Sequence, residues 1–78
     1  MYKKKEIIMM SGSDAIKRVR NELNLEQLDF AKKVNVSKTA IYNYEMGTRK
    51  PRPAIAFRIR DFAKSQGVDV SIEELLTD

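Results

Sequence analysis

Cysteine and histidine are both absent from this 78-residue chain. Without cysteine, neither a disulfide framework nor a thiolate metal site can stabilise the fold, which must rest on packing alone. Without histidine, the commonest general base and metal ligand is missing. The sequence also holds no glycine-rich phosphate loop and no serine-centred nucleophile elbow. We therefore expect no enzymatic activity, no catalytic residue, no metal, no cofactor and no small-molecule ligand.

Long hydrophobic runs are absent as well. The longest run near the N-terminus is Ile7 to Met10, which is too short for the core of a signal peptide and far below the about 18 residues of a membrane span. Hydrophobic residues nevertheless make up 42% of the chain, which suits one small domain of ordinary globular composition. We expect a soluble, unexported protein without a membrane partner.

The charged residues are unevenly distributed along the chain. Residues 1–60 carry 14 basic and 6 acidic side chains, whereas residues 61–78 carry 1 and 5. This arrangement indicates a polyanionic partner for the front of the chain. Because many small soluble domains are equally basic, charge alone leaves nucleic-acid binding open.

The pattern of apolar residues divides the chain into a basic N-terminal arm, residues 1–12, and a helical domain, residues 13–78. Lys3, Lys4 and Lys5 open the arm, which we expect to be flexible. These lysines could enter a minor groove or stay solvated. After the arm, apolar residues recur with a helical period, and the domain has no alternating strand pattern of useful length. The fold class predicted is all-α.

Five helices are predicted in this domain, each from its capping residues and apolar period. Asn35 stands at a sharp turn between the second and third, because asparagine tolerates the left-handed region. The first predicted helix has Ser13 as its N-cap and ends at Asn21 to Asn24, and the second runs from about Glu26 to Val34. The third runs from Lys38, after the N-cap Ser37, to about Met46, before Gly47. The fourth runs from Pro53 to about Gln66, and a short fifth helix starts at the Ser71/Glu74 capping box.

The third predicted helix has two unlike faces on a helical wheel. Ala40, Ile41 and Tyr44 gather on one side, which we expect to face the core. The opposite side is polar and consists of Lys38, Thr39, Tyr42 and Asn43. A basic loop follows this helix and contains Arg49, Lys50 and Arg52 between stiffening prolines.

The predicted core is the set of apolar residues on the inward stripes: Ile16, Val19, Leu23, Phe30, Ala31, Val34, Val36, Ile41, Tyr44, Ile59 and Phe62. Phe57 lies nearly opposite the inward stripe of its helix. Together with Leu75 and Leu76 it is a candidate dimer contact, because one chain of this size need not bury all three. The alternative is that the arm folds back over Phe57 with Ile7 and Ile8.

The stretch from Gln27 to Gly47 carries a series of residue types at fixed spacing. The series is Gln27, Phe30-Ala31, Val34-Asn35-Val36-Ser37, Ile41, Tyr44-Glu45 and Gly47. It resembles the Cro/CI-type helix-turn-helix family, also called the XRE family, whose usual turn reads Leu-Gly-Val-Ser. With the flanking helices the likeness covers residues 14–76. Asn35 in place of glycine, Glu26 in place of a Ser or Thr cap, and the basic arm depart from the family pattern.

This resemblance implies a compact five-helix, lambda-repressor-like domain that binds double-stranded DNA. Base contacts are expected from Lys38, Thr39, Tyr42 and Asn43 in the major groove, with Asn43 suited to adenine and Lys38 to guanine or a phosphate. Phosphate contacts are expected from Gln27 at a helix N-terminus and from Arg49, Lys50 and Arg52. The alternative for each set is a solvated polar surface. Arg20 and Glu45 border inward stripes, and we expect a partly buried structural ion pair between them.

The function predicted is a sequence-specific transcriptional regulator that acts as a homodimer on an inverted repeat. It is expected to be a repressor that occupies promoter DNA, and activation through contact with polymerase is the alternative, because the sequence does not show the direction of regulation. The resemblance places it in the bacterial cytoplasm, or encoded by a phage within it. The alternative is a protein-interaction module of the same fold, such as an antitoxin or antirepressor. An acidic recognition face would favour that alternative, and the predicted face has no acidic residue.

Overall fold

The computed structural model describes residues 11–77, which form five α-helices. The basic arm predicted over residues 1–12, with Lys3, Lys4, Lys5, Ile7 and Ile8, therefore lies almost entirely outside the described residues. The helices are α1 (Gly12–Glu22), α2 (Gln27–Val34), α3 (Lys38–Met46), α4 (Pro53–Ser65) and α5 (Ile72–Leu76). The described part of the chain is thus all-α, as predicted.

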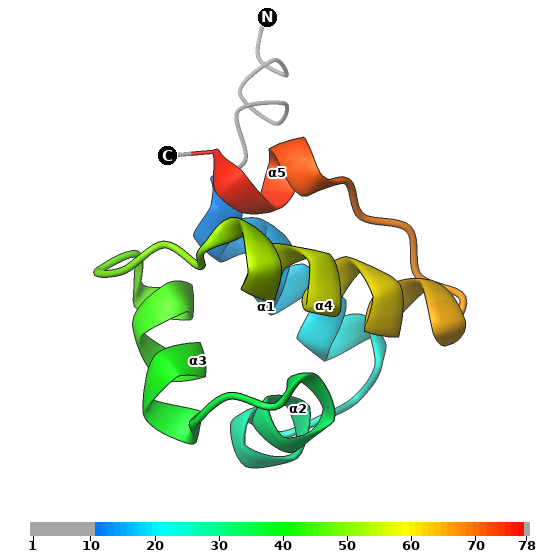
Figure 1. Cartoon of the computed structure of the whole chain (residues 1–78). Helices are drawn as coiled ribbons and strands as arrows, with labels where there is room; N and C mark the ends of the chain where they lie inside the picture. The colour runs from blue at the N-terminus through cyan, green and yellow to red at the C-terminus, as the bar shows by residue number, and fades with distance from the viewer. Residues whose placement is uncertain (1–10, 78) are drawn as a thin grey trace, which may run out of the picture.

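The helices pack around one core without forming layers. α1 packs against α3 and α5, while α4 packs against α2 and α5. Figure 1 shows α5 beside the start of α1 and of α4, with α2 and α3 on the side of the molecule away from α5. This arrangement leaves one side of α3 without a covering helix.

The first helix begins earlier than its capping pattern predicted. Ser11, not Ser13, is the N-cap: its hydroxyl accepts a hydrogen bond from the Asp14 N–H, and the Asp14 carboxylate accepts one from the Ser11 N–H. This reciprocal capping box satisfies two helix-end donors, which a cap at Ser13 would not do. At the other end α1 includes Asn21, and the chain reverses at Asn24, whose φ is 56°.

The turn between α2 and α3 has the backbone conformation that was predicted from its sequence. Asn35 adopts the left-handed conformation, with φ 59° and ψ 51°. Ser37 is the N-cap of α3 and accepts a hydrogen bond of 3.0 Å from the Ala40 N–H. Glu26 is the N-cap of α2 but makes no side-chain capping bond, and α2 begins at Gln27, next to the predicted start at about Glu26.

The buried core contains eight of the eleven residues predicted for it. Leu23, Val36 and Phe62 are only partly buried and pack against its edge, with the Phe62 ring centroid 6.1 Å from that of Phe30. The prediction missed several residues that the C-terminal segment and the helix crossings bury: Ala15, Ala56, Ala63, Val68, Val70 and Leu75. Leu75 is fully buried, because α5 folds back onto α1 and α4.

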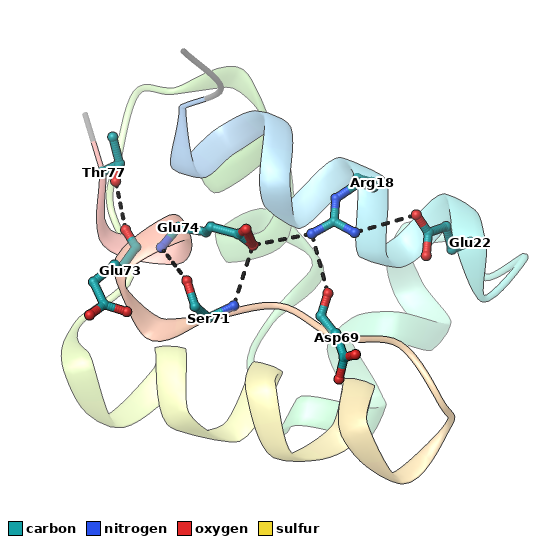
Figure 2. A network of polar contacts seen from close by, with 7 residues as sticks. All are labelled: Arg18, Glu22, Asp69, Ser71, Glu73, Glu74 and Thr77. Atoms are coloured by element: carbon teal, nitrogen blue, oxygen red, sulfur yellow. Dashed lines mark hydrogen bonds and ion pairs between the residues drawn. The ribbon is translucent and has the colours of Figure 1, made fainter. Parts of the chain in front are cut away.

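Arg18 ties α1 to the C-terminal segment on the opposite side of the molecule from α3. Its guanidinium donates to Glu22 on its own helix at 3.4 Å, to the Asp69 carbonyl at 3.4 Å and to Glu74 on α5 at 3.2 Å (Figure 2). Glu74 also belongs to the capping box of α5 with Ser71, which the sequence predicted. All three ionic side chains are at least 30% exposed, so this network adds little to stability.

Gly12 allows α5 to approach α1 closely. Its N–H donates to the Thr77 carbonyl at 2.8 Å. A Cβ at this position would lie 2.5 Å from the Leu75 carbonyl oxygen and 2.9 Å from that of Thr77. Both neighbours are backbone atoms, so neither can move aside without displacing α5.

Replacing Gly12 by alanine is therefore expected to destabilise the protein, although alanine is the better helix former by about 1 kcal/mol. We expect the clash to outweigh that gain and to lower the free energy of unfolding by about 1–3 kcal/mol, as measured by urea denaturation. Asn21→Ala, on an exposed position of the same helix, is the control and should be neutral or slightly stabilising. Equal stability of the two variants would contradict the close approach.

Candidate nucleic-acid interface

The uncovered side of α3 carries the polar residues that were predicted as base contacts. Lys38, Thr39 and Tyr42 are exposed and Asn43 is half-buried. Ile41, Tyr44 and Glu45 on the other side of the helix are buried. The packing of α3 on α1 and α2 thus separates the two faces as the helical wheel predicted.

The N-terminus of α2 adjoins this face. Gln27, the first residue of α2, lines a shallow depression together with Lys38, Thr39 and Tyr42. Because Glu26 makes no side-chain capping bond, no side chain caps the N–H groups of the first turn of α2. Such N–H groups and the positive end of the helix dipole favour an anion. The start of α2 therefore lies beside the polar face of α3, with the carboxylates of Glu26 and Asp29 at the same helix end.

The side chain of Gln27 is hydrogen-bonded to the ion pair between Arg20 and Glu45. Arg20 Nε donates to Glu45 Oε2 at 2.6 Å, and its Nη2 donates to Glu45 Oε1 at 2.9 Å. Gln27 Nε2 donates to the same Oε1 at 3.2 Å. The ion pair expected between Arg20 and Glu45 is thus present and joins α1, α2 and α3 where they meet.

The charges of this pair are largely removed from solvent. The side chains of Arg20 and Glu45 are 17% and 5% exposed. The hydrogen bond with Glu45 raises the pKa of Arg20 above its ordinary value, although desolvation opposes the shift. Arg20 therefore faces Glu45 as a cation at neutral pH, as an arginine ordinarily does. Its Nη1 also donates to the Leu25 carbonyl at 2.9 Å, which fixes the loop before α2.

The basic loop between α3 and α4 extends the interface. Arg49, Lys50 and Arg52 are exposed, while Pro51 between them is buried and anchors the loop. Figure 1 shows this loop projecting beside α3. The cations predicted as phosphate contacts therefore lie next to the helix predicted to read bases.

Two residues at this interface were missed by the sequence analysis. Arg58 on α4 donates to the carbonyls of Val34 and Asn35 at 3.0 and 2.9 Å, and so fixes the turn between α2 and α3. Thr48 Oγ1 lies 3.2 Å from both the backbone oxygen and the side-chain Oδ1 of Asn43. No sequence signal marks the Arg58 contacts, because they depend on how α4 packs against the turn. The Thr48 contact is local and follows from the reversal of the chain at Gly47.

The three candidate dimer contacts have unlike surroundings. Phe57 is 46% exposed, and Arg60 Cζ lies 4.9 Å from the centroid of its ring. Leu76 is half-buried, whereas Leu75 belongs to the core of a single chain. Of the three, Phe57 offers the largest exposed apolar surface.

Within residues 11–77 the structure shows neither a group of acidic side chains able to hold a metal ion nor a helix long and apolar enough to cross a membrane. The larger depressions near α3 are open and lined by polar side chains. The surface around α3 is thus suited to contact another molecule across an exposed face.

Two short helices joined by a tight left-handed turn, with the second presenting a polar face, define a helix-turn-helix protein. A family model described as Helix-turn-helix, HTH_3, matches residues 16–64, and the chain belongs to this family, which includes the XRE or Cro/CI type. Among curated proteins and solved structures, none matches the chain closely enough to count as a relative. The family is one of DNA-binding domains without enzymatic activity, and it associates this chain with transcriptional regulation.

Proposed function

We propose that the protein is a sequence-specific repressor that inserts α3 into the major groove of an operator. The observation that carries this proposal is the polar, acid-free face of α3 beside a loop with three exposed cations. A B-form major groove about 12 Å wide admits one α-helix, whose N-terminal residues then face the base edges. An operator occupied in this way is closed to polymerase.

Each part of the interface has a distinct role in the proposal. Lys38, Thr39, Tyr42 and Asn43 contact base edges and supply sequence preference. Gln27 at the start of α2 contacts one phosphate. Arg49, Lys50 and Arg52 contact phosphates from the loop and supply affinity that depends on salt.

The proposed repressor acts in the cytoplasm as a homodimer on an inverted repeat. A two-fold dimer places two recognition helices about 34 Å apart, on successive turns of the same side of the duplex. The ring of Phe57 on α4 is 46% exposed, and this exposed apolar surface supports a dimer contact through α4.

Binding to a library of randomised duplexes tests the proposal. We expect an inverted repeat to be enriched. Asn43→Ala should reduce discrimination at one position of each half-site by about 1–3 kcal/mol, because one base contact is lost. Arg49→Ala should weaken binding to all sequences alike, because one phosphate contact is lost. It should also reduce the steepness of log K against log salt concentration by about 0.9 per half-site.

Lys64→Ala is the matched control for the charge change. Lys64 is an exposed cation near the C-terminal end of α4 and lies outside the proposed interface. Its removal should leave the salt slope unchanged. A slope that falls equally in Arg49→Ala and Lys64→Ala would show nonspecific attraction and contradict the assigned phosphate contact.

A protein-interaction module of the same fold is the second candidate function. Leu28, Tyr42 and Met46, on α2 and α3, are 47%, 50% and 60% exposed, and such apolar side chains also suit a protein partner. If the library yields no enriched sequence and binding is lost near physiological salt, this candidate replaces the repressor.

A further inference from the structure

We infer that Thr48 is a positioning residue that sets the base preference of Asn43, an inference that rests on the proposed function. Asn43 is the only amide among the four proposed base contacts. An asparagine amide carries an acceptor at one end and a donor at the other, so a 180° flip exchanges what it offers to a base. Its preference therefore depends on whatever fixes that orientation.

The turn after α3 brings the Thr48 hydroxyl to this amide. Gly47 takes a positive φ of 80°, which reverses the chain immediately after α3. Thr48 Oγ1 is thereby placed 3.2 Å from Asn43 Oδ1, five residues earlier in the chain. A straight continuation of the helix would carry Thr48 away from Asn43, because residues five apart lie on different sides of a helix.

The hydroxyl proton has two acceptors within reach, both on Asn43: the backbone oxygen and Oδ1, each 3.2 Å from Thr48 Oγ1. The backbone oxygen already accepts the N–H groups of Gly47, Thr48 and Arg49 at the helix end. Oδ1 is therefore the less crowded of the two acceptors for the hydroxyl proton.

This hydrogen bond orients the amide for one base. With Thr48 on one lone pair of Oδ1, the second lone pair and both Nδ2 protons remain for DNA. An acceptor beside a donor matches the N6 amino group and N7 of adenine in the major groove. In the flipped amide Nδ2 would donate to the Thr48 hydroxyl oxygen, but the hydroxyl proton would then have only the crowded Asn43 backbone oxygen as acceptor, and the match to adenine would be lost. Thr48 thus favours adenine at the position that Asn43 reads, without touching DNA itself.

Thr48→Val and Thr48→Ser test this inference beside Asn43→Ala on the randomised duplex library. Valine keeps the shape of threonine and removes the hydroxyl, whereas serine keeps the hydroxyl. We expect Thr48→Val to reduce adenine preference about threefold to tenfold at the position that Asn43→Ala relaxes, because the freed side chain regains alternative orientations. Thr48→Ser should retain the preference of the unmodified protein, and all other positions and the salt slope should be unchanged.

Several results would overturn the inference while leaving the repressor standing. These are full adenine preference in Thr48→Val, loss of preference at all positions alike, a preference for another base at the Asn43 position, or no effect of Asn43→Ala on any base. Thermal unfolding of each variant separates the loss at one position from a general loss of fold. If the unmodified protein itself enriches no sequence, the proposed function fails, and the inference fails with it.

Discussion

Replacing Arg20 by methionine is expected to lower the free energy of unfolding by about 3–5 kcal/mol, which is much of the stability of a domain this small. The substitution leaves the Glu45 carboxylate 5% exposed and without its cation. It also removes the hydrogen bond from Arg20 to the Leu25 carbonyl. The cost is large because the remaining charge is stranded, and not because the pair itself contributes that much. Urea denaturation at neutral pH measures this loss of unfolding free energy.

Arg18→Met is the matched control for this substitution. Arg18 lies on the same helix and also pairs with glutamates, Glu22 and Glu74, but the side chains of that network are at least 30% exposed (Figure 2). We expect its removal to cost no more than about 1 kcal/mol. The double replacement of Arg20 and Glu45 by methionine should cost less than the sum of the single changes, because no charge is stranded. An Arg20→Met variant as stable as Arg18→Met would contradict the buried pair.

Replacing Leu75 by alanine is expected to lower the free energy of unfolding by about 2–5 kcal/mol. Leu75 is fully buried beneath α5, which is only five residues long and is held by its contacts with α1 and α4. The truncation leaves a cavity, and it weakens the attachment of the whole segment. Since Leu75 is buried within one chain, the loss should be the same at every protein concentration, which thermal unfolding over a hundredfold dilution series can check.

Phe57→Ala distinguishes a core residue from a surface contact. Replacing a fully buried phenylalanine by alanine costs at least about 3 kcal/mol of unfolding free energy. Phe57 is 46% exposed, so we expect its replacement to cost a single chain about half of that or less, below about 1.5 kcal/mol. If Phe57 forms the proposed dimer contact, its effect should instead grow with protein concentration. A Leu75→Ala effect that depends on concentration, or that is no larger than that of Phe57→Ala, would contradict the placement of Leu75 in the core.

The local conformation of the recognition region could be predicted from the sequence because its signals are local. Asn35 tolerates the left-handed turn, Ser37 supplies the N-cap, and Gly47 ends α3, each through the backbone of its immediate neighbours. The two faces of α3 follow from the helical period alone. The start of α1 was misplaced by local reasoning, since Ser11 and Ser13 are both able to cap and the choice depends on the carboxylate of Asp14.

The exposed polar face of α3 and the turn before it were therefore determined by the sequence itself, since capping and periodicity act over a few residues. Only the tertiary structure decided that Leu75 belongs to the core, that a Cβ at Gly12 would meet the backbone of α5, and that Arg58 holds the turn between α2 and α3. These properties depend on contacts between segments that the chain brings together by folding: α5 on α1, and α4 on the turn between α2 and α3. A single sequence does not encode such contacts in its spacing, because the distance between two side chains is set by the packing of the helices that carry them.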